Sequence, residues 1–273
     1  MNSDTKWKVD MIKEYVSKNN IVIMNLTETW LKEEDQDEKI PNYVTFRGDR
    51  KGGKTKGGGV AIYIRDGFEG KVILEDYVES CEIVAVYIEK INIINIVVYR
   101  PPDTKLPVFT AIMNKINKLL SEMEKPEPTV ILTGDFNFPF IEWKRSEVGA
   151  CSWTMKRGTY GTEDEKSQFH KMMEVIDKYH LVQSIEEPTR RENTLDLVFT
   201  NEIETFKQVE VARTILSDHD LIEIRTDIEW NEKDRGEGDK QTDMREGDLH
   251  RLNFHSEKIP WPEIQKRLSE IDW

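Results

Sequence analysis

The chain contains 273 residues, of which 37% are hydrophobic and seven are Trp, so it can bury the core of one large domain or two small ones. Its net charge of −13 argues against a protein that holds nucleic acid mainly by bulk charge, because phosphate neutralisation requires Lys and Arg at the contact face. The sequence lacks the roughly 18 consecutive apolar residues of a membrane span and the apolar core of a signal peptide. We therefore expect a soluble intracellular protein whose two cysteines, Cys81 and Cys151, are reduced thiols.

The charge is unevenly distributed. Residues 47–66 carry six basic side chains against two acidic ones, a net charge of +4 in a glycine-rich stretch. Such a stretch suits contact with a phosphate backbone, although a solvated hairpin tip is its commoner fate. By contrast, residues 227–248 contain nine acids and four bases with almost no apolar groups, which predicts a polar linker. The candidate nucleic-acid contacts are Arg50, Lys51, Lys54 and Lys56 in the basic segment and Arg100 further along the chain.

The periodicity of apolar residues predicts an alternation of helices and strands. In chain order we expect a helix at 6–18, strands near 21–26, 60–64, 72–77, 82–88 and 91–99, a helix at 106–122, a strand at 130–132, a helix at 167–179, strands at 195–200 and 221–226, and a short helix at 259–271. Many strands with few helices favour a layered α/β or α+β domain over residues 1–229. An acidic polar linker at 230–258 and a helical connector at 259–273 would follow it.

Polar side chains follow two of the predicted strands where each strand ends. Glu28 comes after the strand at 21–26, and Asp135 with Asn137 comes after the strand at 130–132. Strand ends are positions at which binding and catalytic sites are built. Each position also has a structural explanation, since Glu28 could be a solvated acid and the other two could shape an Asx-type turn.

Asp196 is embedded among apolar neighbours in the strand at 195–200. Because burying an acid without a partner is unfavourable, Asp196 either faces solvent or has a partner, and a histidine is the obvious one. The sequence Ser217-Asp218-His219 stands directly before the strand at 221–226 and supplies a candidate general base.

These dispersed acids favour a hard divalent cation. Mg²⁺ commonly binds through one or two carboxylates together with water and substrate phosphate oxygens. A zinc site is disfavoured, because the chain has only five histidines and none of them forms the closely spaced pair of a zinc-binding helix. Trp143, Trp153 and Tyr160 could stack on nucleic acid, although core packing is the default for any single aromatic residue.

A set of motifs, in order along the chain, resembles those of the endonuclease/exonuclease/phosphatase superfamily. More narrowly, they resemble the apurinic-endonuclease-like domain of non-LTR (LINE-type) retrotransposon polyproteins. The motifs are Thr27-Glu28-Thr29-Trp30-Leu31, Gly57-Gly58-Gly59-Val60-Ala61, Tyr99-Arg100-Pro101-Pro102, Gly134-Asp135-Phe136-Asn137, Asn193-Thr194-Leu195-Asp196-Leu197-Val198-Phe199-Thr200-Asn201 and Ser217-Asp218-His219.

The resemblance implies a DNase I-like, four-layered α/β sandwich in which two packed mixed β-sheets are flanked by helices. It implies a phosphodiesterase that uses Mg²⁺, with Mn²⁺ as a substitute, and that nicks one strand of double-stranded DNA, as in target-primed retrotransposition. Such an enzyme would be nuclear if it acts on genomic DNA. The sequence indicates neither a membrane nor a protein partner.

The resemblance also implies roles for individual residues. Glu28 would ligate the metal with help from Asp218, and Tyr99 would donate a hydrogen bond to the phosphate. The remaining site residues would act on the attacking water and the phosphate. Asp135 would orient or deprotonate that water, and Asn137 would hold the water or the phosphate. His219, oriented by Asp196, would bind a phosphate oxygen or act as the base.

Two features depart from this family. Its members open with an apolar strand ending in an active-site Asn, whereas this chain begins Met1-Asn2-Ser3-Asp4, so that Asn2 stands at a compatible distance before Glu28 without a strand in front of it. The end of the chain resembles the connector toward a reverse transcriptase. Two alternatives therefore stay open: a catalytically idle remnant of a retrotransposon open reading frame, and a phosphatase of the same superfamily.

Overall fold

The structure, a computed structural model, describes residues 3–226 except for 33–34, 36–38, 52–56, 124–126, 148–149 and 159. These residues belong to one compact unit, Met1–Asp234. The predicted linker at 230–258 and connector at 259–273 lie outside the described residues, as do Asn2, Lys54 and Lys56.

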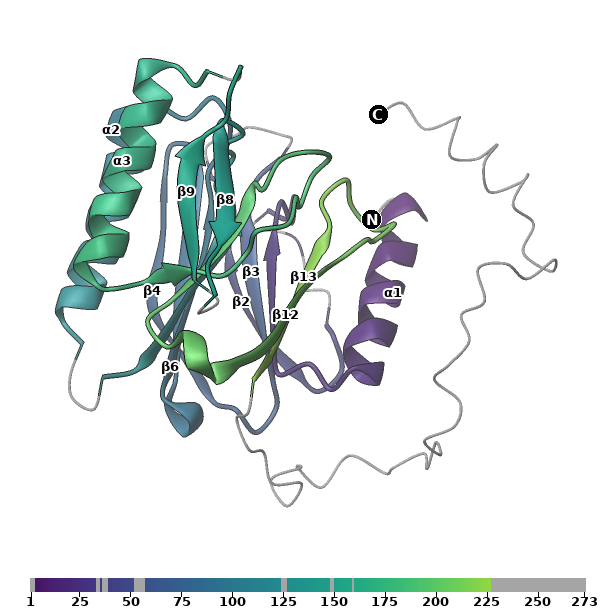
Figure 1. The fold of residues 1–273 in the computed structure, drawn as a ribbon. Helices are drawn as coiled ribbons and strands as arrows, with labels where there is room; N and C mark the ends of the chain where they lie inside the picture. Colours follow the sequence, from purple (N-terminus) through teal and green to yellow (C-terminus); the bar gives the residue numbers. More distant parts are fainter. Residues whose placement is uncertain are drawn as a thin grey trace. The chain divides into compact units, whose positions relative to one another are not determined.

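The described residues form three sheets and three α-helices (Figure 1). The helices are α1 (Ser3–Lys18), α2 (Leu106–Ser121) and α3 (Glu163–Lys178). The strands are β1 (Ile23–Thr27), β2 (Tyr43–Gly48), β3 (Val60–Arg65), β4 (Gly70–Val78), β5 (Cys81–Ile88), β6 (Ile93–Tyr99), β7 (Thr129–Asp135), β8 (Ile141–Arg145), β9 (Cys151–Met155), β10 (Val182–Gln183), β11 (Asp196–Thr200), β12 (Phe206–Ala212) and β13 (Leu221–Thr226).

The largest sheet has eight strands in the order β4-β5-β6-β7-β11-β10-β9-β8. It is mixed, because β6 and β7 pair in parallel while the other neighbouring strands pair antiparallel. A smaller sheet has the order β1-β3-β2, and β12 pairs with β13. The parallel β6–β7 pair is joined by α2, as a parallel connection requires. The strand that ends at Asp135, β7, lies between β6 and β11 in the interior of this sheet.

The two larger sheets pack face to face because alternate side chains of their strands point to opposite sides. In β5, Ile83 and Ala85 pack against α2 and α3, whereas Val84 and Val86 pack against Ile62 of β3. The other face of the small sheet is covered by α1. The layers are therefore α2 and α3, the large sheet, the small sheet, and α1, which confirms the predicted sandwich (Figure 1).

The predicted helices and most predicted strands within the described residues are present. The prediction for α3 began too late, because its first turn is polar and carries no apolar periodicity. That turn is fixed by a capping box in which Thr162 accepts from the backbone N–H of Glu165 and the Glu165 carboxylate accepts from that of Thr162. Five strands were missed: β2, β8, β9, β10 and β12.

Two further expectations can be compared with the structure. Cys81 and Cys151 are not paired with each other, as expected for reduced thiols. Within the described part of the chain, no helix is both long enough and apolar enough to cross a membrane.

Candidate active site

Four polar side chains form a row across neighbouring strands of the large sheet. Glu82 in β5 pairs with Tyr99 in β6, Tyr99 with Asp135 in β7, and Asp135 with Asp196 in β11. Directly paired residues point to the same face of a sheet, and here that face is the one covered by the small sheet. The strand register therefore brings together four residues whose first and last members, Glu82 and Asp196, are 114 positions apart in the sequence.

The end of β7 is shaped by a close approach of two backbones. At Gly134, which has a φ of +152°, an added Cβ would lie 1.9 Å from the carbonyl oxygen of Val98 in β6. A side chain at this position would push the strands apart, so glycine is required just before Asp135. The Asp135 side chain is consequently held close against Tyr99 and is almost fully buried.

Asp135 and Asn137 form the predicted turn as well as part of the site. The backbone N–H of Asn137 donates to Asp135 Oδ1 at 3.1 Å, and Asn137 has a left-handed backbone with a φ of +51°. Its Nδ2 donates to the carbonyl oxygen of Arg100 at 3.0 Å. The two explanations considered for this stretch are therefore compatible, since the turn presents the Asp135 carboxylate.

Arg100 stabilises this turn through buried hydrogen bonds to its backbone. Its guanidinium Nη1 donates to the carbonyl oxygens of Phe136 at 2.9 Å and Asn137 at 3.1 Å, and Nε donates to Gln168 at 2.8 Å. The side chain is 0% exposed and stacks 4.2 Å from the ring centroid of Phe138. The prediction that Arg100 contacts nucleic acid is therefore wrong, because the residue is buried inside the fold.

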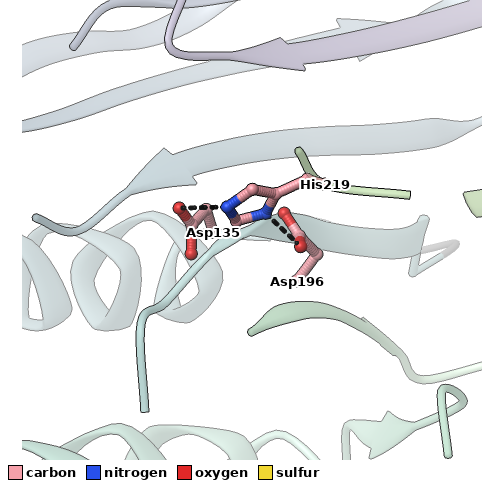
Figure 2. A group of neighbouring side chains, drawn as sticks. All are labelled: Asp135, Asp196 and His219. Atoms are coloured by element: carbon pink, nitrogen blue, oxygen red, sulfur yellow. Dashed lines mark hydrogen bonds and ion pairs between the residues drawn. The ribbon is translucent and has the colours of Figure 1, made fainter. Parts of the chain in front are cut away.

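His219 lies between two carboxylates, as Figure 2 shows. Its Nδ1 is 2.7 Å from Asp196 Oδ2, and its Nε2 is 4.0 Å from Asp135 Oδ2. Asp196 thus has the histidine partner that its apolar surroundings predicted. Among the described residues, these three side chains are the group of His, Cys, Asp and Glu whose ligand atoms lie within 4.8 Å of one another.

The electrostatics of this group differ from those of free side chains. Burial and the neighbouring Asp196 carboxylate raise the pKa of Asp135 to about 7. Burial alone would lower the pKa of His219, but the hydrogen bond and charge of Asp196, with the charge of Asp135, raise it above its usual value. His219 therefore favours its cationic form more than a free histidine does.

Thr189 links Asp196 to the loop that carries His219, through Asp220, and sequence reasoning missed it. Its Oγ1 accepts from the backbone N–H groups of Leu195 at 3.1 Å and Asp196 at 3.0 Å. Its carbonyl oxygen accepts from the backbone N–H of Asp220 at 2.7 Å. A single threonine in a loop carries no sequence signal for this role.

Glu28 lies on the Tyr99 side of the row, at the end of the small sheet. Its carboxylate accepts from the Tyr99 hydroxyl and, at 2.6 Å, from the indole Nε1 of Trp30. Burial and Glu28 both raise the pKa of Tyr99, so its hydroxyl stays protonated and acts as a donor. The structure brings the predicted residues Glu28 and Tyr99 together.

The glycine run at 57–59 allows close packing around Glu28. A Cβ at Gly58 would lie 2.2 Å from the Arg50 guanidinium carbon, and one at Gly59 would lie 2.4 Å from Thr29 Oγ1. The sequence predicted Arg50 to be a nucleic-acid contact on an open loop. In the structure its side chain is only 10% exposed, and its Nε donates to Glu82 at 2.7 Å. Its guanidinium also lies over the Tyr99 ring, 5.7 Å from the centroid.

The remaining predicted residues are on the surface. The Asp218 carboxylate accepts from Arg190 and its side chain is 59% exposed, and its role at the metal stays a prediction. Lys51 is exposed, with its ammonium 5.7 Å from the Tyr77 ring centroid.

A cavity of about 300 Å³ lies beside Asn137. Its walls include Asn137, Glu165, Arg190, Arg191, Asn193 and Leu195.

Comparisons with known proteins find both a family model and solved structures that resemble this chain. A family model described as endonuclease-reverse transcriptase matches residues 93–223, which include Tyr99, Asp135, Asp196 and His219. No curated protein sequence matches the chain. Solved structures do match, and because their sequence identities are low, the likeness shows the fold alone.

In three of these structures the match covers nearly the whole length of the other chain. The endonuclease domain of TRAS1, a telomere-specific non-LTR retrotransposon, has a TM-score of 0.53 at 13% identity and covers 84% of this chain and 95% of its own. An AP endonuclease from Archaeoglobus fulgidus has a TM-score of 0.54 at 13% identity, covering 81% and 94%. A 3′ phosphatase from Neisseria, bound to a product DNA hairpin, has a TM-score of 0.55 at 13% identity, covering 81% and 95%. The matched family model and the shared sandwich fold make the chain similar to members of the endonuclease/exonuclease/phosphatase superfamily.

Proposed function

We propose that the protein is a Mg²⁺-dependent DNA endonuclease that nicks one strand. The observation that carries this proposal is the row Tyr99–Asp135–Asp196 with His219 held 2.7 Å from Asp196 and facing Asp135. Phosphodiester hydrolysis requires an activated water and stabilisation of charge on the phosphate, and this row offers a base, a cation and a neutral donor. The similarity to a retrotransposon endonuclease domain supports DNA as the substrate.

The donor set fits a hard divalent cation at Glu28 better than at His219. His219 Nδ1 is engaged by Asp196, and Mg²⁺ prefers oxygen ligands, so the histidine group is a poor Mg²⁺ site. Within the described part of the chain, the Glu28 carboxylate accepts hydrogen bonds from the neutral donors Tyr99 and Trp30. A cation held by Glu28 would neutralise charge on the phosphate oxygens.

Asp135 is the better candidate for the base. Its pKa, raised to about 7 by burial and by Asp196, makes it a stronger base than an ordinary aspartate. Asn137 occupies Asp135 Oδ1, which leaves Oδ2, on the side of His219, to accept a proton from water.

His219 is the better candidate for the phosphate-binding cation. Because the charges of Asp196 and Asp135 raise the pKa of His219, its imidazolium form would place a charged N–H donor, Nε2, beside the phosphate. Tyr99, whose raised pKa keeps it protonated, adds a neutral donor on the other side.

We infer further that the nick serves target-primed retrotransposition, in which case the protein would act on genomic DNA in the nucleus. The matched family model, described as endonuclease-reverse transcriptase, supports this role.

Supercoiled plasmid tests the proposed activity. Incubation with Mg²⁺ should convert the plasmid to the open-circular form before linear DNA accumulates, and EDTA should abolish the conversion. Plasmid that stays supercoiled with Mg²⁺ and with Mn²⁺ would contradict the proposal.

A phosphatase activity is the second candidate, favoured by the similarity to a 3′ phosphatase bound to product DNA. An oligonucleotide carrying a 3′-phosphate separates the two. Release of inorganic phosphate without cleavage of the strand would favour the phosphatase, whereas internal cleavage favours the endonuclease.

A further inference from the structure

Trp30 is an exposed tryptophan directly beside the candidate metal carboxylate. It is 59% exposed, whereas Trp143 is 3% exposed and packs against Phe169 and Phe199. The only polar atom of its side chain, Nε1, donates to Glu28 Oε2 at 2.6 Å. The ring is therefore anchored at the site by its N–H, and most of its apolar surface faces solvent.

The backbone holds this exposed ring in an unfavourable conformation. Trp30 has a φ of +56° and Glu28 a φ of +55°, a region that bulky side chains rarely adopt. Two hydrogen bonds to the glycine run fix the conformation, from Trp30 N–H to Gly58 O at 2.9 Å and from Thr29 N–H to Gly59 O at 3.3 Å. Backbone strain of this kind persists where the surroundings enforce it, and it clusters at ligand-binding positions.

Core packing does not explain Trp30, because the strained backbone delivers the ring to solvent rather than to the interior. Burial of an apolar ring usually stabilises a fold, and an aromatic residue left exposed beside a polar site is typical of a ligand contact. The ligand must fit a flat apolar ring whose edge lies at the carboxylate of Glu28.

We propose that Trp30 stacks on a nucleobase next to the phosphate that lies beside the cation of Glu28, so that the site selects a nucleic-acid strand over a small phosphate ester. This inference rests on the proposed function of the same site. A base and its phosphate are linked through one sugar, which suits a ring anchored on the carboxylate that would hold the cation beside the phosphate. Stacking is tolerant of base identity, because every base has a flat face.

Positive charge on both sides of the row is compatible with a strand crossing it. Lys51 is exposed on the segment that follows Arg50, and Arg190 and Arg191 line the cavity beside Asn137. A small phosphate ester would occupy the centre of the row without reaching either end.

Two variants separate stacking from the alternative that Trp30 only orients Glu28. Trp30→Phe keeps an aromatic face and loses the hydrogen bond to Glu28, whereas Trp30→Ala loses both. Stacking predicts that Trp30→Phe keeps a KM close to that of the wild type. Orientation of Glu28 alone predicts that both variants lose kcat to the same extent with KM unchanged.

The test uses an oligonucleotide whose cleavage position has been mapped with the wild-type protein. The nucleotides on each side of that position are then replaced, one at a time, by an abasic tetrahydrofuran analogue. Trp30→Ala should raise KM about 10-fold or more on the intact strand. This loss should disappear on the one substrate that lacks the stacked base. The proposal is overturned if the Trp30→Ala effect on KM is absent, or if it is the same on every abasic substrate.

A binding measurement distinguishes failure of this inference from failure of the proposed function. Fluorescence anisotropy of a labelled oligonucleotide with Asp135→Ala protein, with and without Trp30→Ala, requires no cleavage. Weaker binding of the double variant, with a loss that disappears when one nucleotide of the oligonucleotide is made abasic, supports stacking even if the plasmid is never nicked. Equal binding by the two proteins overturns stacking and leaves the plasmid assay to decide the activity.

Discussion

The carboxylate of Asp196 lies 2.7 Å from Nδ1 of His219, although Asp196 begins a strand of the large sheet and His219 lies in the loop before β13. This hydrogen bond fixes which imidazole nitrogen faces Asp135. Because Asp196 is itself paired with Asp135 across β7 and β11, the sheet sets the positions of both carboxylates and the loop supplies the ring between them.

Replacement of Asp196 by Asn should disorient His219 and remove the charge that raises its pKa. We expect the nicking rate of Asp196→Asn to fall about 100-fold or more, the range in which a positioned acid or base contributes. In nuclear magnetic resonance titrations, the pKa of the His219 imidazole should be lower in Asp196→Asn than in the wild type. A His219 pKa that is unchanged in the variant would contradict the role assigned to this pair.

The stability of the metal-free protein should fall as the pH rises. Asp135 has a pKa of about 7 in the folded state against about 4 in the unfolded chain, so across this interval the folded state binds more protons. The raised pKa of His219 acts in the same direction at higher pH, since its stabilising ion pair is lost as the imidazolium deprotonates. The free energy of unfolding should therefore decrease from about pH 4 through 7.

Asp135→Asn should remove most of this dependence. At pH 8 the variant should be more stable than the wild type by roughly 1–4 kcal/mol, because it no longer buries a charged carboxylate beside Asp196. Urea unfolding of both proteins without divalent cations, at several pH values, measures the difference. A wild type whose stability rises over this interval would be inconsistent with the raised pKa of Asp135.

Arg100 should matter for stability rather than for binding DNA. Arg100→Met leaves the carbonyl oxygens of Phe136 and Asn137 without their buried donor, and should destabilise the protein by roughly 2–4 kcal/mol. Thermal or urea unfolding measures this loss.

The salt dependence of DNA binding provides the matched comparison for Arg100. Removing a phosphate contact lowers the slope of log affinity against log salt by about one. Lys51→Ala, at an exposed lysine that remains a predicted contact, should lower the slope in this way. Arg100→Met, which also removes a positive charge, should leave the slope unchanged, and a reduced slope would restore Arg100 as a DNA contact.

A folded site that binds Mg²⁺ should raise the melting temperature when the cation is added, because ligand binding to the native state alone stabilises it. We expect this increase for the wild type and for the surface variant Asp177→Ala, and we expect it to be lost in Glu28→Gln. The absence of any increase in the wild type, with weak DNA binding retained, would instead favour a catalytically idle remnant.

The sequence was most informative where strands are apolar and end in polar residues. Tyr99, Asp135 and Asp196 could be recognised one by one, but their common row depends on strand register, which is set by pairing between distant segments. The strand that carries Trp143, β8, alternates buried and exposed residues over too few positions for the period of a strand to stand out. β10 has only two residues and no periodicity to detect.

Arginines were the least predictable residues of the site. Arg50 lies in a glycine-rich stretch and Arg100 stands directly before two prolines, signals typical of exposed loops, and a basic charge at such a position suits a phosphate contact. Both are instead enclosed by the fold, Arg50 by Glu82 and Arg100 by carbonyl oxygens and the Phe138 ring. Neither partner set is close in sequence, so only the packed structure shows it.

The most direct test of the account is the single-turnover rate at which the protein nicks supercoiled plasmid with Mg²⁺. Asp135→Ala and His219→Ala should each reduce this rate by about 100-fold or more, while Asp177→Ala and His170→Ala, on the exposed side of α3, should nick at the wild-type rate. Nicking that persists unchanged in Asp135→Ala and His219→Ala would contradict the proposed site.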